Sequence, residues 1–153
     1  MVMGRKSYEK VLSFPCEWPY KGKYVVLLSK TKTLPLEHVD ETYNGENPDT
    51  FLQNLHAEKG INRIYIDGGQ TIRHFLEADL VDEMTLAYIP MTLGKGIRLF
   101  PDWCEQMAAK DTFWHLQACK HTEETSVIQL QYVRLTQPSP SPDNNDVSES
   151  NDA

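Results

Sequence analysis

Short apolar runs that alternate with helix-like segments constrain this chain more than any other feature of its sequence. Residues 24–29 (YVVLLS) and 63–67 (RIYID) are two such runs, rich in β-branched and aromatic side chains. Continuous apolar runs are typical of strands that are buried on both faces of a parallel sheet. Segments with apolar residues at helical spacing lie between them. The pattern predicts an α/β fold in which helices flank a mostly parallel sheet.

The remaining elements follow from periodicity and from the positions of glycine and proline. We expect helices at residues 7–13, 48–59 and 70–78, and further strands at 1–3, 38–42 and 84–89. The last two strands, 113–120 and 126–135, should form an antiparallel hairpin at one edge of the sheet. Residues 1–136 are thus expected to form one domain. Residues 137–153, rich in Pro, Ser, Asp and Asn, are expected to be a disordered acidic tail.

Charge argues against several classes of partner. The net charge is −7, and four of the acidic residues lie in the segment 137–153, which has no Lys or Arg. The rest of the chain is therefore only mildly acidic and can keep local positive potential for an anionic ligand. A broad basic surface for nucleic acid is not expected. No apolar run approaches the ~18 residues of a membrane helix, so a membrane partner is not expected either.

The cysteines and histidines are scattered. Cys16, Cys104 and Cys119 are odd in number and far apart, which favours reduced thiols in a cytoplasmic protein over a disulfide framework. The five histidines lack the His-x-x-x-His spacing that places two ligands on one helical face. No metal site is predicted.

The first of three candidate ligand turns is Gly4-Arg5-Lys6-Ser7, between a predicted strand and a predicted helix. A helix N-terminus offers unpaired N–H groups and a partial positive charge, which suit a phosphate. Arg5 and Lys6 add two cations, and Ser7 adds a hydroxyl. The alternative is a solvated helix start with Ser7 near the cap.

The second candidate is Gly68-Gly69-Gln70-Thr71, again between a strand and a helix. Paired glycines let a ligand approach the backbone without obstruction by a Cβ atom, and Thr71 can cap the helix or bond a phosphate. This is not the three-glycine dinucleotide fingerprint. A plain tight turn is the alternative.

The third candidate is Leu28-Ser29-Lys30, at the end of an apolar strand, where Ser29 and Lys30 can act as paired donors to a phosphate monoester. An ordinary polar strand end is the alternative. Ligands gather at the carboxyl ends of parallel strands. We therefore expect residues 28–30, 4–7 and 68–71 to lie on one rim of the sheet, as an elongated polyphosphate ligand requires.

Taken in order, these segments resemble the dihydrofolate-reductase-like superfamily, and in particular the branch related to the C-terminal reductase domain of bacterial riboflavin biosynthesis proteins. The resemblance covers about residues 2–135. The matching segments are 2–8 (VMGRKSY), 18–20 (WPY), 26–29 (VLLS), 66–69 (IDGG), 75–76 (FL), 80–83 (LVDE), 89–90 (IP), 93–96 (LGKG) and 99–100 (LF).

The resemblance implies NADPH bound across the strand ends of a mixed sheet. The turn at residues 4–7 would contact cofactor phosphates. Leu28 and Ser29, followed by Lys30, would lie near the adenosine 2′-phosphate, and residues 68–71 near the pyrophosphate. The residues alone locate the same three turns, whereas only the resemblance specifies NADPH.

The implied activity is that of an NADPH-dependent oxidoreductase acting on a C=N bond or ring-opened sugar imine of a pterin- or pyrimidine-like substrate. 5-Amino-6-(5-phosphoribosylamino)uracil is the first expectation, and dihydrofolate is the second. Leu93, Gly94 and Gly96 form a loop expected to admit the substrate, with a plain mobile turn as the alternative. The rival hypothesis is an inactive nucleotide-binding or dimerisation module. The resemblance also implies a homodimer.

One departure from the superfamily concerns its usual first elements. Members generally begin earlier, with a strand, a Leu-Asp-Gly-type loop and a helix, whereas this chain starts inside what would be the second strand. The absent strand would lie beside the strand that ends at Asp67, and the absent helix carries the acid that supports protonation in folate reductases. We therefore expect a truncated gene model or a fragment. No residue is assigned as the proton donor.

Overall fold

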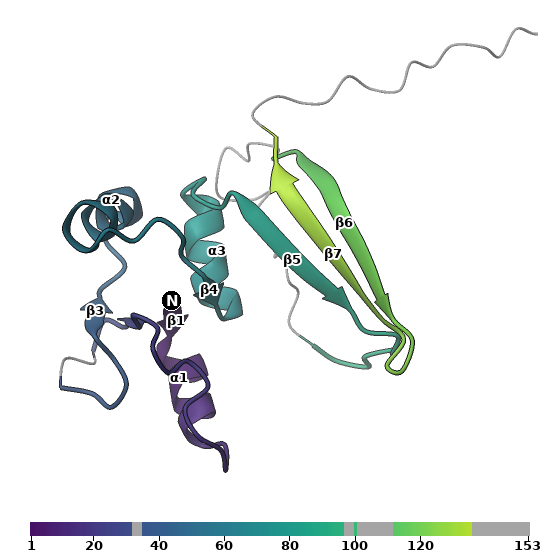
Figure 1. Ribbon diagram of the computed structural model, residues 1–153, viewed down its shortest axis with the longest axis horizontal. Coiled ribbons are helices and arrows are strands. Elements are labelled where there is room, and N and C mark those ends of the chain that lie inside the picture. Colours follow the sequence, from purple (N-terminus) through teal and green to yellow (C-terminus); the bar gives the residue numbers. More distant parts are fainter. Residues whose placement is uncertain (32–34, 97–99, 101–111, 136–153) are drawn as a thin grey trace, which may run out of the picture. The chain divides into compact units, whose positions relative to one another are not determined.

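The computed structural model describes residues 1–31, 35–96, 100 and 112–135 (Figure 1). Its elements divide into two units. Met1–Val81 make up the main part of the first unit, and the second begins at Asp82. The expected tail at residues 137–153 and Cys104 lie outside the described residues.

A four-stranded parallel sheet forms the centre of the first unit. Its strands are β1 (Val2–Gly4), β2 (Val26–Leu28), β3 (Glu41–Tyr43) and β4 (Ile66–Asp67), in the order β3-β2-β1-β4. All three strand pairs are parallel, which confirms the predicted parallel sheet. The strand expected at 38–42 is β3, and it begins later than predicted. His38 has φ 58, a left-handed conformation that a strand does not accept.

Three helices accompany this sheet at nearly the predicted positions. They are α1 (Arg5–Leu12), α2 (Pro48–Lys59) and α3 (Gly69–Glu77). α1 begins two residues earlier than predicted because Gly4 ends β1 and caps the helix at once, with an extended backbone (φ −79, ψ 157). α2 has Pro48 in its first turn. It ends at Gly60, whose left-handed backbone (φ 66) is the usual glycine stop.

The helices cover both faces of the parallel sheet with buried apolar side chains. On one face the buried cluster joins strand residues to α2 and α3: Val2, Val26, Tyr43, Phe51, Leu55 and Phe75. On the other face the cluster joins strand residues to α1: Met3, Tyr8, Val25 and Leu27. Burying one large apolar side chain contributes about 1.5–3 kcal/mol. The two cores therefore hold the sheet and its three helices together.

The second unit is a three-stranded antiparallel sheet. Its strands are β5 (Glu83–Tyr88), β6 (Trp114–Thr122) and β7 (Val127–Arg134), in the order β5-β7-β6. The β6–β7 hairpin confirms the prediction. β7 pairs with β5 along the whole of that strand. The hairpin therefore joins β5 in a sheet of its own, instead of forming the edge of the parallel sheet as predicted.

No membrane-spanning helix occurs in the described ranges. The longest helix described, α2, has 12 residues, whereas a span needs about 20 apolar residues.

Candidate functional site

The three predicted ligand turns leave the parallel sheet at the same edge. Gly4 of β1 is the register partner of Leu28 in β2, and Met3 of β1 is the partner of Asp67 in β4. Because the strands are parallel, residues 28–30, 4–7 and 68–71 follow the carboxyl ends of three adjacent strands. We call these residues the carboxyl edge. The expectation that the three turns come together is met.

The two glycine turns pack against one another. A Cβ atom on Gly4 would come within 2.8 Å of the Thr71 Oγ1 atom, and one on Gly68 within 2.6 Å of the Ser7 Oγ atom. Gly68 also has φ 94, which side chains rarely adopt. Only glycine fits at either position without a shift of its neighbours. The N-termini of α1 and α3 are therefore held in contact.

The Thr71 side chain lies between the two glycines. It is 2% exposed, and its Oγ1 atom would be 3.7 Å from a Cβ atom on Gly68 as well as 2.8 Å from one on Gly4. Among the described residues its hydroxyl has no hydrogen-bond partner. A buried polar group without a partner costs about 1–3 kcal/mol. The hydroxyl is thus a donor that a ligand oxygen at this point would satisfy.

The N-termini of α1 and α3 are suited to an anion, and that of α2 is less so. Neither α1 nor α3 has a side-chain cap or an acidic residue in its first turn. α2 carries Asp49 there. The first N–H groups of a helix have no partner within it and carry partial positive charge. Two such ends meet at the carboxyl edge, and neither is neutralised by its own first turn.

Space is available beside these helix ends. Gly69, the first residue of α3, is exposed, and a Cβ atom placed on it would meet nothing within 4 Å. Paired glycines here leave the backbone N–H groups accessible to a ligand.

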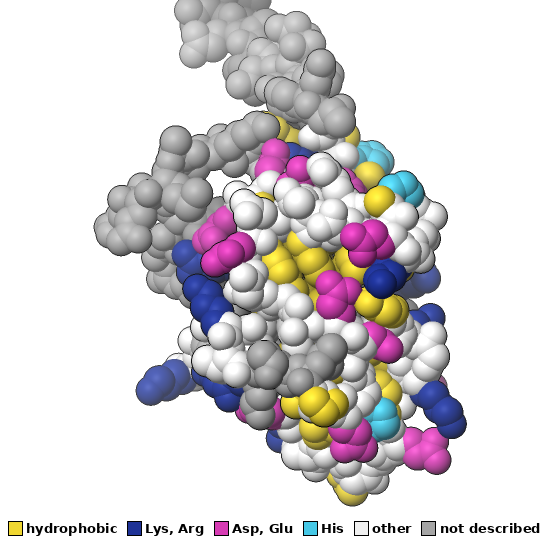
Figure 2. Space-filling view, turned by 90° about the vertical axis from the view of Figure 1, so that its left-hand side faces the viewer, with side chains coloured by type: hydrophobic (Ala, Val, Ile, Leu, Met, Phe, Trp, Pro, Cys, Tyr) yellow, Lys and Arg dark blue, Asp and Glu magenta, His cyan; other side chains and the backbone are white. Residues whose placement is uncertain are grey.

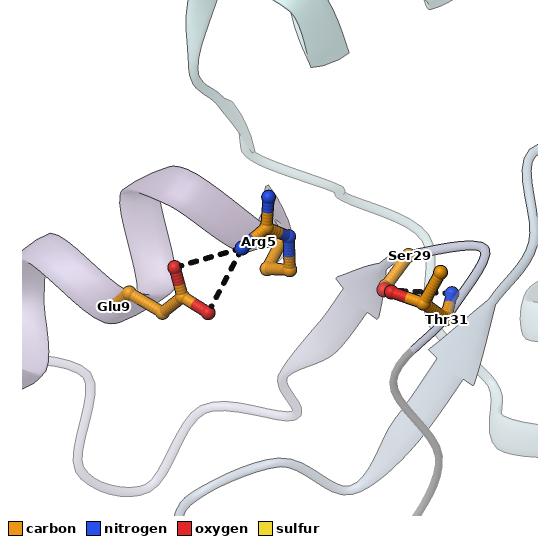
Figure 3. A network of polar contacts seen from close by, with 4 residues as sticks. All are labelled: Arg5, Glu9, Ser29 and Thr31. Carbon is orange, nitrogen blue, oxygen red and sulfur yellow. Dashed lines mark hydrogen bonds and ion pairs between the residues drawn. The ribbon is translucent and has the colours of Figure 1, made fainter.

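Basic side chains flank the helix ends. The Arg5 Nη1 atom donates to both carboxylate oxygens of Glu9, at 3.1 and 3.2 Å (Figure 3). Lys6 and Lys30 are exposed, and neither has an ion pair among the described residues. Ser29 Oγ accepts a hydrogen bond of 3.3 Å from the Thr31 amide (Figure 3).

The surface drawn in Figure 2 carries charges of both signs. On the face of the molecule in Figure 2, acidic and basic side chains are mixed around a central group of hydrophobic side chains. Nowhere in the described part of the chain do three His, Cys, Asp or Glu side chains come together as potential metal ligands.

A fourth loop at the same edge was not predicted as part of the site. Residues 44–47 follow the carboxyl end of β3, and the Asn44 Oδ1 atom accepts a hydrogen bond of 3.0 Å from the Glu46 amide. Gly45 has φ 92, and a Cβ atom there would be 3.4 Å from the Leu28 Cδ1 atom. The Asn-Gly pair directly after a strand is the signal that identifies this turn.

Tyr43 connects this loop to the core. Its ring stacks on Phe51 with centroids 4.0 Å apart, and its hydroxyl lies 3.3 Å from the His74 Nε2 atom. Burial, with a smaller contribution from Glu46, raises the pKa of the Tyr43 hydroxyl. The hydroxyl therefore stays protonated near neutral pH.

The predicted substrate loop lies in the second unit. Leu93, Gly94 and Gly96 are exposed and follow β5. A Cβ atom on Gly96 would come within 2.5 Å of Leu93 Cδ2, so the loop folds on itself there. Its role in substrate binding stays a prediction.

The fold and site define the class of protein. The chain has a parallel sheet with helices on both faces, two helix N-termini at the carboxyl edge of that sheet, and an antiparallel hairpin near its C-terminal end. These features place it among the dihydrofolate-reductase-like α/β proteins. Residues 21–129 match the RibD C-terminal domain, and the chain belongs to that family.

Comparisons with individual proteins agree with this assignment. The chain is 30% identical over 135 residues to YwjB of Bacillus subtilis (strain 168), a protein described as uncharacterized; the match covers 88% of this chain and 72% of YwjB. A crystal structure of a putative riboflavin biosynthesis protein from Shewanella sp. PV-4 is 37% identical with a TM-score of 0.72. That match covers 88% of this chain and 72% of the other.

Two more distant structures share the fold. A pyrimidine reductase-like protein of Corynebacterium diphtheriae is 16% identical with a TM-score of 0.64, and the match covers 89% of this chain and 75% of the other. RibD of Acinetobacter baumannii is 22% identical with a TM-score of 0.60. This chain is covered to 88% but spans only 46% of that RibD chain.

Proposed function

We propose that this chain acts as a reductase of the riboflavin biosynthesis type and that its carboxyl edge binds the phosphates of NADPH. One observation carries the proposal. Two uncapped helix N-termini meet at adjacent strands, and the buried Thr71 hydroxyl between Gly4 and Gly68 has no partner among the described residues. Unpaired donors in this arrangement are what a bridging diphosphate satisfies.

The residues present fit the parts of the cofactor. The pyrophosphate would be held by the first N–H groups of α1 and α3 and by the hydroxyls of Ser7 and Thr71. The 2′-phosphate of the adenosine would lie toward Ser29 and Lys30, because these follow β2, the neighbour of β1 on the side away from β4. An exposed lysine at that end favours NADPH over NADH, which lacks this phosphate.

When bound, NADPH supplies the hydride, so that the protein's own contribution is binding, orientation and electrostatics. The substrate class we propose is a pyrimidine that carries a ribosyl phosphate. It is supported by the family match and by the name of the Shewanella structure. No side chain of this chain is assigned as a proton donor.

The experiment on binding uses Gly69→Ala. The methyl group meets no protein atom within 4 Å, so the variant should fold as the wild type does, while its Cβ atom enters the space offered to the ligand. We expect calorimetric titration to show NADPH binding to the wild type and at least about tenfold weaker binding to Gly69→Ala. Asn54→Ala, at an exposed position on α2, is the control and should bind as the wild type does.

Absence of NADPH binding to the wild type would overturn the proposal. The reductase activity is tested separately, by following oxidation of NADPH with an aminouracil ribosyl phosphate as substrate. Binding without turnover would favour the inactive nucleotide-binding module instead.

A further inference from the structure

We propose that Glu9 is a resident counter-anion of the carboxyl edge: it occupies Arg5 when no ligand is bound, and a nucleotide phosphate displaces it. Glu9 would thereby set the affinity of the site for phosphate. This inference rests on the proposed function, because it assumes that a phosphate-bearing ligand binds at the carboxyl edge.

The geometry places a carboxylate where a phosphate would be expected to meet Arg5. Arg5 is the first residue of α1 and directly follows Gly4. Side chains on a helix tilt toward its N-terminus, so Glu9 reaches back one turn and both of its carboxylate oxygens approach the same Nη1 atom (Figure 3). A guanidinium group binds a phosphate through the same donors that it uses for a carboxylate.

The pair is accessible to exchange. The side chains of Arg5 and Glu9 are 44% and 42% exposed, and an exposed ion pair of this kind is weakly held and screened by salt. A phosphate carries more charge than a carboxylate and would also be held by the two helix N-termini. It should therefore replace Glu9 at Arg5 without disturbing the fold.

Replacing Glu9 by a phosphate at Arg5 costs free energy, which reduces the affinity for the ligand. Arg5 has to leave Glu9, and the carboxylate of Glu9 remains near the bound phosphate as a like charge. Neutralising Glu9 removes both costs. The expected direction is thus a gain in affinity, although removal of an ion-pair partner is usually a loss.

The chain supplies a matched control. Arg73 and Glu77 form the same type of pair at the same spacing on α3, with the Arg73 Nε atom 2.5 Å from the Glu77 Oε1 atom. Glu77 is the last residue of α3, at the end of the helix away from the carboxyl edge. Glu77→Gln removes the same charge from the chain without freeing a cation at the site.

The experiment is a double-mutant cycle read by calorimetric titration with NADPH. We expect Glu9→Gln to tighten binding by about two- to fivefold, the range that an exposed ion pair supports. Arg5→Ala should weaken NADPH binding. Adding Glu9→Gln to Arg5→Ala should change the affinity little further, because Arg5 is then no longer present to be released from Glu9. Glu77→Gln should leave the affinity unchanged.

Weaker or unchanged binding by Glu9→Gln would overturn the inference, because Glu9 would then orient Arg5 or do nothing. If Glu9→Gln tightened NADPH binding equally in the Arg5→Ala background, the inference would also be overturned. The gain in affinity would then come only from the change in the net charge of the protein. If the wild type does not bind NADPH, the proposed function fails. The same cycle with inorganic pyrophosphate then decides the role of Glu9, and absence of pyrophosphate binding would overturn that role too.

Discussion

The two units of this molecule are stabilised in different ways. Every buried side chain among the described residues belongs to the first unit, whereas the described side chains of β5, β6 and β7 are all half-buried or exposed. The antiparallel sheet has long ladders instead, including the full length of β5 against β7. One unit is thus organised around cores, and the other around hydrogen-bonded pairs.

The difference follows from how the strands are connected. Parallel strands need crossover connections, and here α1 joins β1 to β2 and α2 joins β3 to β4. The short strands of the first unit are therefore stabilised by helices that cover both faces of the sheet. The β6–β7 hairpin closes locally, and its cross-strand pairs are the unit of stabilisation. The three candidate ligand turns belong to the first unit, whose strands and helices share the two buried cores.

The largest expected effect contrasts one core phenylalanine with one exposed phenylalanine. Phe75 is fully buried, and Phe113 is 45% exposed. Phe75→Ala should lower the free energy of unfolding by about 3–5 kcal/mol through lost burial and a cavity, and Phe113→Ala by less than about 1 kcal/mol. Urea denaturation of both variants provides the measurement. Equal losses of unfolding free energy in the two variants would show that the second unit has a core that contributes as much stability as those of the first unit.

The next effect tests the close packing at the carboxyl edge. Gly68 and Gly60 both have positive φ, so an alanine at either position carries about 1–3 kcal/mol of backbone strain. Only Gly68→Ala also brings a methyl group against Ser7. It should therefore destabilise more than Gly60→Ala and weaken NADPH binding at least about tenfold. Thermal unfolding compares the stability of the two variants, and calorimetric titration compares their affinity for NADPH. Equal NADPH affinity of the two variants would contradict the proposed site.

Alkaline pH should affect the first unit through Tyr24. Burial first, and then a 2.9 Å hydrogen bond to Glu41, raise the pKa of the Tyr24 hydroxyl to about 12. Unfolded tyrosine loses its proton near pH 10, so the free energy of unfolding should fall as the pH rises from about 10 to about 12. Tyr24→Phe should reduce this slope. Denaturation from neutral to about pH 11 measures it, and an unchanged slope would exclude Tyr24 as a contributor.

The smallest effect concerns the β6–β7 turn. Ser126 has φ 55, which costs a non-glycine residue about 1–2 kcal/mol. Glycine removes that strain but loses about 0.5–1 kcal/mol in entropy. Ser126→Gly should thus stabilise the hairpin by at most about 1 kcal/mol. The measurement is amide hydrogen exchange. In Ser126→Gly, exchange of the β6 and β7 amides should be slower than in the wild type. Exchange of the β1 and β2 amides, which serve as the internal control, should not change.

The sequence was sufficient to predict the elements and the meeting of the three candidate turns at one edge of the sheet. Apolar runs and glycine turns placed the strands and helices within a few residues. Parallel pairing alone brings Gly4, Leu28 and Gly68 to one edge, because parallel strands of one sheet end on the same side. Both the elements and their common edge were predicted from local sequence patterns.

Side-chain contacts between elements were not predictable in the same way. Nothing in the sequence indicates that β7 takes β5 as its partner, because that choice depends on contacts remote in the chain. Likewise, the sequence pattern left Thr71 as either a helix cap or a phosphate ligand, and only the packing of α1 against α3 places its hydroxyl beside Gly4. The fold was therefore read from periodicity, and the detail of the site required the structure.

The direct passage from β1 into α1 has a consequence for how sequences of this type can vary. Gly4 is both the last strand residue and the helix cap, so an inserted residue at this junction would rotate α1 by about 100° around its axis. Such a rotation would carry Tyr8 out of the hydrophobic interior and turn Arg5 and Lys6 toward other surroundings. Insertions should therefore accumulate between α1 and β2, while the spacing from Val2 to Tyr8 stays constant.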